Sequence, residues 1–152
     1  MNPGLFVCYN VLGDIMERIE KQMQFILEID KEKQIKRKTL QSNGKDFEDD
    51  AQHAWHMAIM TLLLSEYANE KIDVLKTISM LLIHDLVEID AGDTYAYDDQ
   101  GLKTQSEREN LAANRIFNLL PEDQAKKVFD LWNEFEERKT PEAKFARVMD
   151  NF

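Results

Sequence analysis

The stretch LLIHDLVEIDAGD, residues 81–93, opens with an apolar run, residues 81–89, that contains three ionisable side chains. His84, Asp85 and Glu88 stand among leucine, isoleucine and valine residues, which are typical of a core helix. A buried charge without a partner costs several kcal/mol or forces the group to become neutral. The pattern therefore predicts either a structural ion pair or a functional site opposite this segment.

The spacing of the three residues allows both explanations. On a helix, the side chains of His84 and Asp85 diverge by roughly 100°, yet both can reach an ion that lies over their shared edge. Glu88 follows His84 by four residues and Asp85 by three, which places it on the same side. An ion pair or a solvated helix edge is the commoner explanation of such a triplet. The apolar flanks favour a site here, because the helix has little other exposed surface.

The two remaining histidines lie three residues apart in the sequence DDAQHAWHMA. That spacing puts His53 and His56 on one helical face, although His-x-x-His alone is a weak metal signal. Imidazole and carboxylate are the ligands that a borderline divalent cation prefers. His84, Asp85 and one of the two other histidines would supply three such ligands. Spacing does not choose a fourth, but Asp150, in the apolar-periodic segment AKFARVMDNF, is the most conspicuous late carboxylate.

Composition argues against several other classes of protein. The formal net charge of −10 disfavours a nucleic-acid-binding surface, which is usually basic. A run of about 18 apolar residues is absent, so we expect no membrane segment. A single cysteine, Cys8, excludes an internal disulfide and a cysteine zinc site, and it fits a reducing cytoplasm. The sequence also lacks a glycine-rich phosphate loop and a Gly-x-Ser-x-Gly nucleophile motif.

Helical periodicity runs through the whole sequence, and no alternating strand pattern persists. We therefore predict an all-α, single-domain bundle of about six helices over residues 1–152. The helices are expected at residues 12–28, 51–67, 74–91, 106–119, 121–138 and from 141 onward. The polar residues 41–50 are expected to form a loop before the second helix.

Local signals indicate where three of these helices begin or end. Asp49 or Asp50 can cap the second helix with a side-chain oxygen. Gly92 is expected to end the third helix. Thr140 makes a good N-cap for the last helix, with Pro141 at its first position.

A lone histidine, a His-Asp doublet on a helix and a distant aspartate together resemble the HD-domain metal-dependent phosphohydrolases. The similarity is closest to the branch that includes the 5′-deoxynucleotidases. It extends from the region of Phe25 to the last residue and rests on four segments in order: DDAQHAWHMAIMTLLLSEYA, LLIHDLVEIDAGDTYAYD, LLPEDQAKKVFDLWNEFE and TPEAKFARVMDNF. The resemblance implies the HD-domain fold, one divalent metal ion (Mn, Co, Mg, Zn, Fe or Ni) and removal of phosphate from a nucleoside (deoxy)monophosphate or a similar small ester.

The resemblance also implies roles for individual residues. It implies four metal ligands: His53, His84, Asp85 and Asp150. Glu88 matches the acidic residue that handles the attacking water or the leaving-group proton, and Asp93 matches a second acidic residue near the substrate. Arg37 is similar in place to an arginine that holds the phosphate, although Lys38 stands where characterised relatives carry an aromatic residue. His56 has no ligand counterpart.

Alternatives remain open at this stage. The family usually continues through further helical sequence after its last aspartate, whereas this chain ends two residues beyond Asp150. A truncated, catalytically impaired member that binds a nucleotide or a protein is therefore the alternative function. A di- or triphosphate or a non-nucleotide phosphate is the alternative substrate. The (p)ppGpp hydrolases carry a Glu-Asp pair after the His-Asp doublet, whereas this chain has Glu88-Ile89, which argues against hydrolysis of (p)ppGpp. So short a bundle is expected to leave some apolar helix faces unburied, which predicts a homodimer, and the resemblance implies the same.

Overall fold

The computed structural model describes residues 3–92 and 99–152 of the chain, and the side chains of residues 13–92 and 104–152. Within these ranges the chain forms seven α-helices: α1 (Pro3–Ile29), α2 (Asp50–Leu64), α3 (Val74–Ile83), α4 (Glu88–Ala91), α5 (Asp99–Phe117), α6 (Glu122–Glu137) and α7 (Pro141–Asp150). The other elements are three 3₁₀ helices, η1 (Asp30–Gln34), η2 (Ser65–Tyr67) and η3 (His84–Val87), and two strands, β1 (Lys36–Leu40) and β2 (Phe47–Asp49). The predicted helical fold class is confirmed.

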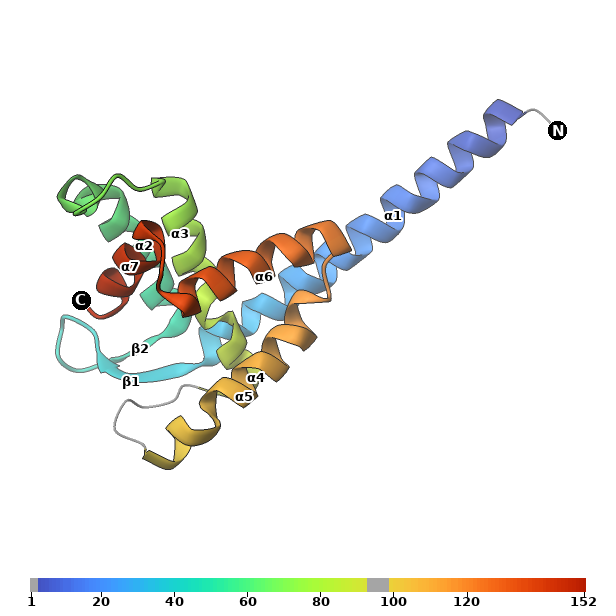
Figure 1. Cartoon of the computed structure of the whole chain (residues 1–152). Coiled ribbons are helices and arrows are strands. Elements are labelled where there is room, and N and C mark those ends of the chain that lie inside the picture. Colours follow the sequence, from blue (N-terminus) through green and yellow to red (C-terminus); the bar gives the residue numbers. More distant parts are fainter. Residues whose placement is uncertain (1–2, 93–98) are drawn as a thin grey trace.

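The helices form a body from which the first half of α1 projects (Figure 1). α2, α3 and α7 pack together at the end of the body that holds the C-terminus, and α6 contacts both α3 and α7. α5 packs against α4 and η3, while the hairpin of β1 and β2 leads directly into α2. None of the described helices is both long and apolar enough to cross a membrane.

The buried core consists of two clusters that share α6. The first lies among α2, α3, α6 and α7 and comprises Met57, Met80, Leu81, Phe135, Ala143, Ala146 and Met149. The second lies among η3, α5 and α6 and comprises Leu86, Val87, Ala112, Ala113, Ile116, Phe117 and Trp132. The chain passes from the first cluster to the second between Leu81 and Leu86. His84 and Asp85 are therefore fixed by packed apolar side chains on both sides in sequence.

The predicted continuous helix over residues 74–91 is wrong. α3 ends at Ile83, and η3 follows before α4 begins at Glu88. Every residue of η3 is buried, so packing on both sides of the chain determines its tighter turn. Apolar periodicity does not distinguish this arrangement from one long helix, because buried 3₁₀ and α turns have the same composition. The predicted stop at Gly92 is confirmed, with a φ of 73° that favours glycine.

The predicted absence of strands is also wrong, because β1 and β2 form an antiparallel hairpin. Lys36 pairs with Asp49 and Leu40 with Phe47 across it. The strands lie within and beside the expected polar loop of residues 41–50. Most of their side chains are exposed on both faces, so they lack the alternation of apolar and polar residues that would reveal a half-buried strand.

The capping signals are largely confirmed. Asp49 accepts a hydrogen bond from the backbone N–H of Gln52, whose side chain bonds back to Asp49, and the two form a capping box at the start of α2. Thr140 caps α7, with Pro141 at its first position. Several boundaries differ from the prediction: α1 and α5 begin earlier, α2 ends earlier, and α6 begins after Pro121.

Candidate metal centre

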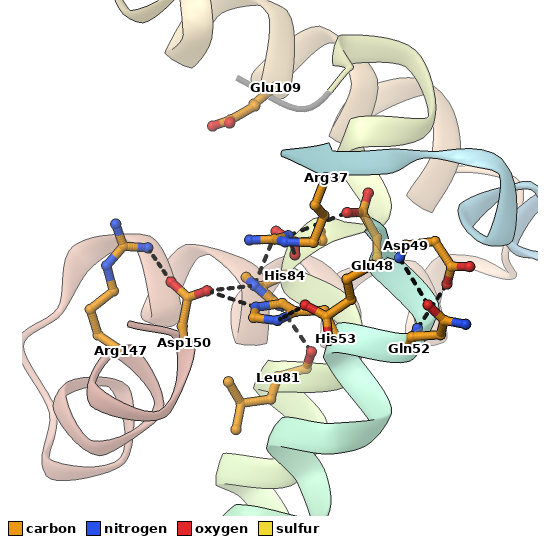
Figure 2. A network of polar contacts seen from close by, with 12 residues as sticks. Arg37, Glu48, Asp49, Gln52, His53, Leu81, His84, Glu109, Arg147 and Asp150 are labelled. Carbon is orange, nitrogen blue, oxygen red and sulfur yellow. Dashed lines mark hydrogen bonds and ion pairs between the residues drawn. The ribbon is translucent and has the colours of Figure 1, made fainter. Parts of the chain in front are cut away.

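His53, His84 and Asp150 converge at one point, although they come from α2, η3 and the end of α7 (Figure 2). One ligand atom from each lies within 4.8 Å of the other two. Asp150 Oδ1 lies 3.2 Å from His53 Nε2 and 3.5 Å from His84 Nε2. Ligand atoms bound at about 2.1 Å to one cation are about 3.0–3.4 Å apart. The observed separations therefore fit a cation held between these side chains.

Both histidines are oriented from behind by a hydrogen-bond acceptor. His84 Nδ1 donates to the backbone carbonyl of Leu81 over 2.9 Å, and His53 Nδ1 lies 3.2 Å from Glu48 Oε2. Each contact engages Nδ1, so the Nε2 atom of each ring faces the common point and can bind a cation once it carries no proton. His84 Nε2 is buried and makes no hydrogen bond of good geometry within the described structure. This arrangement is typical of metal-binding histidines, so the donor set fits a divalent cation.

Asp85 borders the three converging residues. Its Oδ1 lies 3.0 Å from His84 Nε2, and its Oδ2 accepts a hydrogen bond of 2.7 Å from Arg37 Nη1. Arg37 Nη1 also lies 3.3 Å from Asp50 Oδ1. Only 16% of the Arg37 side chain is exposed, so this arginine neutralises two carboxylates inside the protein.

Asp150 is held by both of its oxygens. Arg147 Nη1 donates to Oδ2 over 2.7 Å, while Oδ1 faces the histidines. The Arg147 guanidinium lies over the ring of Phe135, 5.9 Å from its centroid. The Phe135 ring also lies 4.8 Å from the ring of His84. Phe135 therefore contacts both the arginine behind Asp150 and the imidazole of His84.

The surroundings of the centre lower the pKa of Asp85 and of Asp150 and raise the pKa of His84. Burial would raise the pKa of Asp150, but its hydrogen bond with His53 and the nearby charge of His84 hold it well below the usual range. Burial opposes the protonation of His84, but the charge of Asp85 outweighs it and raises the pKa of His84 well above its ordinary value. The pKa of Asp85 is lowered, because His84 and Arg37 outweigh its burial. A cation would replace the proton of His84 as the positive charge between these carboxylates.

A second group of buried carboxyl groups lies behind this centre. Asp50 is fully buried, and burial together with the charge of Asp85 raises its pKa to about 7. The Asp50 carboxyl is hydrogen-bonded to that of Glu88, which is also buried. Two carboxyl groups that bond to each other share one proton. Burial and the charge of Asp85 likewise raise the pKa of Glu32 to about 7.

The structure separates the two histidines that spacing left equivalent. His53 lies in the centre, whereas His56 is exposed and stacks on Trp55 with the ring centroids 6.2 Å apart. Arg37 lies beside Asp85, near the proposed metal ligands. Asp93, predicted to be catalytic, lies outside the described residues.

Sequence reasoning missed Glu48, Arg147 and Glu109. Glu48 lies on a strand that was not predicted, so no periodicity placed it behind His53. Arg147 precedes Asp150 by three residues, and this helical spacing is the signal that could have found it. Glu109 on α5 lies apart from the cluster in Figure 2, and burial raises its pKa, with a smaller contribution from the charge of Asp85.

Residues 29–152 match the family model described as HD domain. The chain belongs to the HD-domain family. The predicted resemblance is therefore confirmed for most of the HD-domain chain, including η1, the hairpin and all helices from α2 to α7.

Curated relatives of this HD-domain chain include 5′-deoxynucleotidases. It is 31% identical to the 5′-deoxynucleotidase HDDC2 of Homo sapiens over 98 residues, which cover 64% of the chain and 47% of the relative. It is 32% identical to the HDDC2 of Dictyostelium discoideum over 136 residues, which cover 86% of the chain and 72% of that relative. The chain thus spans about half the length of several of these relatives, such as the human protein. The similarity supports the branch predicted from the sequence.

A solved structure with the same fold is the predicted metal-dependent phosphohydrolase from Magnetospirillum magnetotacticum MS-1. The two proteins are 48% identical, with a TM-score of 0.83, over 88% of this chain and 67% of the other. A conserved hypothetical protein from Pyrococcus furiosus aligns with a TM-score of 0.67 and 26% identity over 84% of this chain and 74% of that one.

Proposed function

We propose that this HD-domain protein is a divalent-metal-dependent phosphohydrolase that removes phosphate from a nucleoside (deoxy)monophosphate or a similar small phosphate ester. The convergence of His53, His84 and Asp150, with both Nε2 atoms directed inward, is the observation that carries the proposal. One bound divalent cation supplies Lewis-acid polarisation of the phosphoryl group and activation of water. The 5′-deoxynucleotidase relatives support the substrate class.

Asp85 is proposed as the fourth ligand of the cation. Its Oδ2 is taken by Arg37, whereas its Oδ1 lies on the His84 side of the carboxylate, 3.0 Å from Nε2. One oxygen therefore remains for the metal, and the other keeps the carboxylate oriented. Two imidazoles and two carboxylates form a set of neutral and anionic ligands that balances the charge of a divalent cation.

Glu88 is proposed to act as the acid or base. It is buried next to Asp50, whose pKa burial and the charge of Asp85 raise to about 7. A carboxyl pair that retains a proton near neutral pH can exchange it with an attacking water or a leaving oxygen. The proposed catalytic role of Asp93 rests on the resemblance alone.

Arg37 is proposed to hold a phosphoryl oxygen of the substrate. Its Nη1 binds Asp85 and Asp50, but its Nε is buried without a hydrogen-bond partner within the described structure. A buried donor of this kind costs about 1–3 kcal/mol unless an acceptor reaches it. A substrate anion would supply that acceptor, and a planar guanidinium can bind a phosphate and a carboxylate together.

The proposal is tested by measuring phosphate release from deoxynucleoside monophosphates with added Mn²⁺ or Co²⁺. We expect turnover by the wild type and turnover reduced to background in His84→Asn, which removes a proposed ligand. His56→Gln is the matched control, because this histidine is exposed and lies outside the centre. An absence of turnover across the panel in metal-loaded protein would contradict the substrate assignment. An absence of metal binding would favour a binding module that lacks catalysis.

We further propose that the protein is a cytoplasmic homodimer. Exposed apolar side chains lie along α1 and α2: Ile15, Met16, Ile19, Met23, Ile26 and Leu27 on α1, and Trp55, Ile59, Leu62 and Leu63 on α2. Extended exposed apolar patches usually mark interaction sites. Light scattering that gives twice the chain mass of 17.8 kDa would support a dimer, and a monomer mass would contradict it. The single cysteine fits the reducing cytoplasm.

A further inference from the structure

Asp150 occupies a position that is unfavourable for a carboxylate. It is the last residue of α7, where the unpaired carbonyl groups give the helix end a partial negative charge. Its side chain is only 10% exposed, so water does little to offset that repulsion. A cationic group near the end of α7 therefore helps to hold this carboxylate in place.

Arg147 supplies that cation from within the same helix. It lies one turn before Asp150, and its Nη1 donates to Oδ2 over 2.7 Å. Because Oδ2 is occupied in this way, Oδ1 is the oxygen that faces His53 and His84, at 3.2 and 3.5 Å. The contact thus selects which oxygen of Asp150 enters the centre and fixes the rotation of the carboxylate.

Arg147 is itself held in place. Its guanidinium lies over the ring of Phe135, and this ring is almost fully buried and packs against His84. One aromatic side chain therefore positions both the arginine behind Asp150 and the imidazole on the opposite side of the centre. A lysine could retain the charge at residue 147, but it would lose the planar donor geometry and the stacking.

The three other proposed ligands each have a comparable partner. Glu48 lies behind His53, the Leu81 carbonyl behind His84, and Arg37 behind Asp85. Loss of such a partner typically lowers metal affinity about 10- to 100-fold.

We propose that Arg147 is a positioning residue of the metal centre, which acts through Asp150 and raises the affinity for a divalent cation. This inference rests on the proposed metal site, so a suitable experiment must measure metal binding separately from turnover.

Titration calorimetry of the full chain with Co²⁺ tests the proposal. We expect Arg147→Met to bind Co²⁺ about 10- to 100-fold more weakly than the wild type, and Arg147→Lys to lie between them. Asp150→Asn should also weaken binding. Adding Arg147→Met to Asp150→Asn should cause little further loss, because the arginine acts through that carboxylate. A purely structural role would lower the melting temperature without this dependence on Asp150.

Arg18→Met is the matched control. Arg18 pairs with Asp123 at 2.7 Å, as Arg147 pairs with Asp150, but this pair lies on the exposed surface between α1 and α6. The control should retain wild-type affinity for Co²⁺. If the wild type does not bind Co²⁺, the proposed function fails. If the wild type binds and folded Arg147→Met binds equally well, the inference about Arg147 is overturned while the proposed function stands. If Arg147→Met does not fold, unchanged affinity in both Arg147→Lys and Arg147→Gln overturns it.

Discussion

Arg37 in β1 donates a hydrogen bond of 2.7 Å to Asp85 in η3, and this contact ties the hairpin to the segment between the two core clusters. The Arg37 side chain is 16% exposed, and the carboxylates of Asp85 and Asp50 depend on it. Removing one partner of a buried ion pair leaves uncompensated charge and costs about 3–5 kcal/mol. We expect Arg37→Met to lower the free energy of unfolding by about this amount, measured by urea denaturation with a chelator present.

Arg115→Met is the control for this effect. Arg115 also pairs with two carboxylates, those of Asp90 and Glu28, but its side chain is 43% exposed. Exposed ion pairs contribute about 0–1 kcal/mol. Equal destabilisation by the two substitutions would show that burial of Arg37 is not the cause.

Glu48 is expected to strengthen metal binding through His53. Its Oε2 lies 3.2 Å from Nδ1, so it orients the ring and makes Nε2 a better donor. We expect Glu48→Ala to weaken Co²⁺ binding about 10- to 100-fold, and Glu48→Gln, which keeps an acceptor, to weaken it less. Glu70→Ala, on the exposed loop before α3, is the control and should bind normally. Wild-type affinity in Glu48→Ala would refute the role of this carboxylate.

The helices were predictable wherever a local signal coincided with a buried apolar face. Asp49 and Thr140 cap α2 and α7, and each helix then buries apolar side chains, such as Met57 and Met149, in the core. The hairpin was not predictable in the same way, because its charged and exposed residues carry no alternation and its pairing depends on the turn at Gly44. The break at His84 depends on packing between two clusters, which a single segment does not encode.

The candidate site shows a similar division. The sequence marked His84, Asp85 and Glu88 as candidates because ionisable groups stood in an apolar run, and the structure shows that all three are buried. The spacing did not choose between His53 and His56, since both share a helical face; that choice came only from the resemblance to the family, and the positions of α3 and α7 decide which histidine is enclosed. Residues behind the ligands, such as Glu48, are set by contacts between distant segments and have no local signature.

Metal affinity is expected to rise with pH through His84. The charge of Asp85 raises the pKa of this imidazole above its ordinary value, so the imidazolium form of His84 persists to higher pH, and its Nε2 proton must leave before a cation binds there. Protons therefore compete more strongly with the cation for His84 at low pH, and this competition weakens as the pH rises towards the elevated pKa of His84. Calorimetry with Co²⁺ in two buffers of different ionisation enthalpy should reveal release of about one proton per ion bound. Identical enthalpies in both buffers would contradict this coupling.

Glu32 is expected to make the protein less stable as pH rises. Burial raises its pKa from 4.5 to about 7, so between these values the folded protein retains a proton that the unfolded chain releases. The contribution of Glu32 to the free energy of unfolding is therefore most favourable below pH 4.5 and is progressively lost as pH rises through 7. We expect Glu32→Gln to be more stable than the wild type by on the order of 2 kcal/mol at pH 8, with little difference at pH 5. Urea denaturation at the two pH values measures this, with the exposed Glu66→Gln as control. A stability difference that is the same at both pH values would show that the Glu32 proton is not the cause.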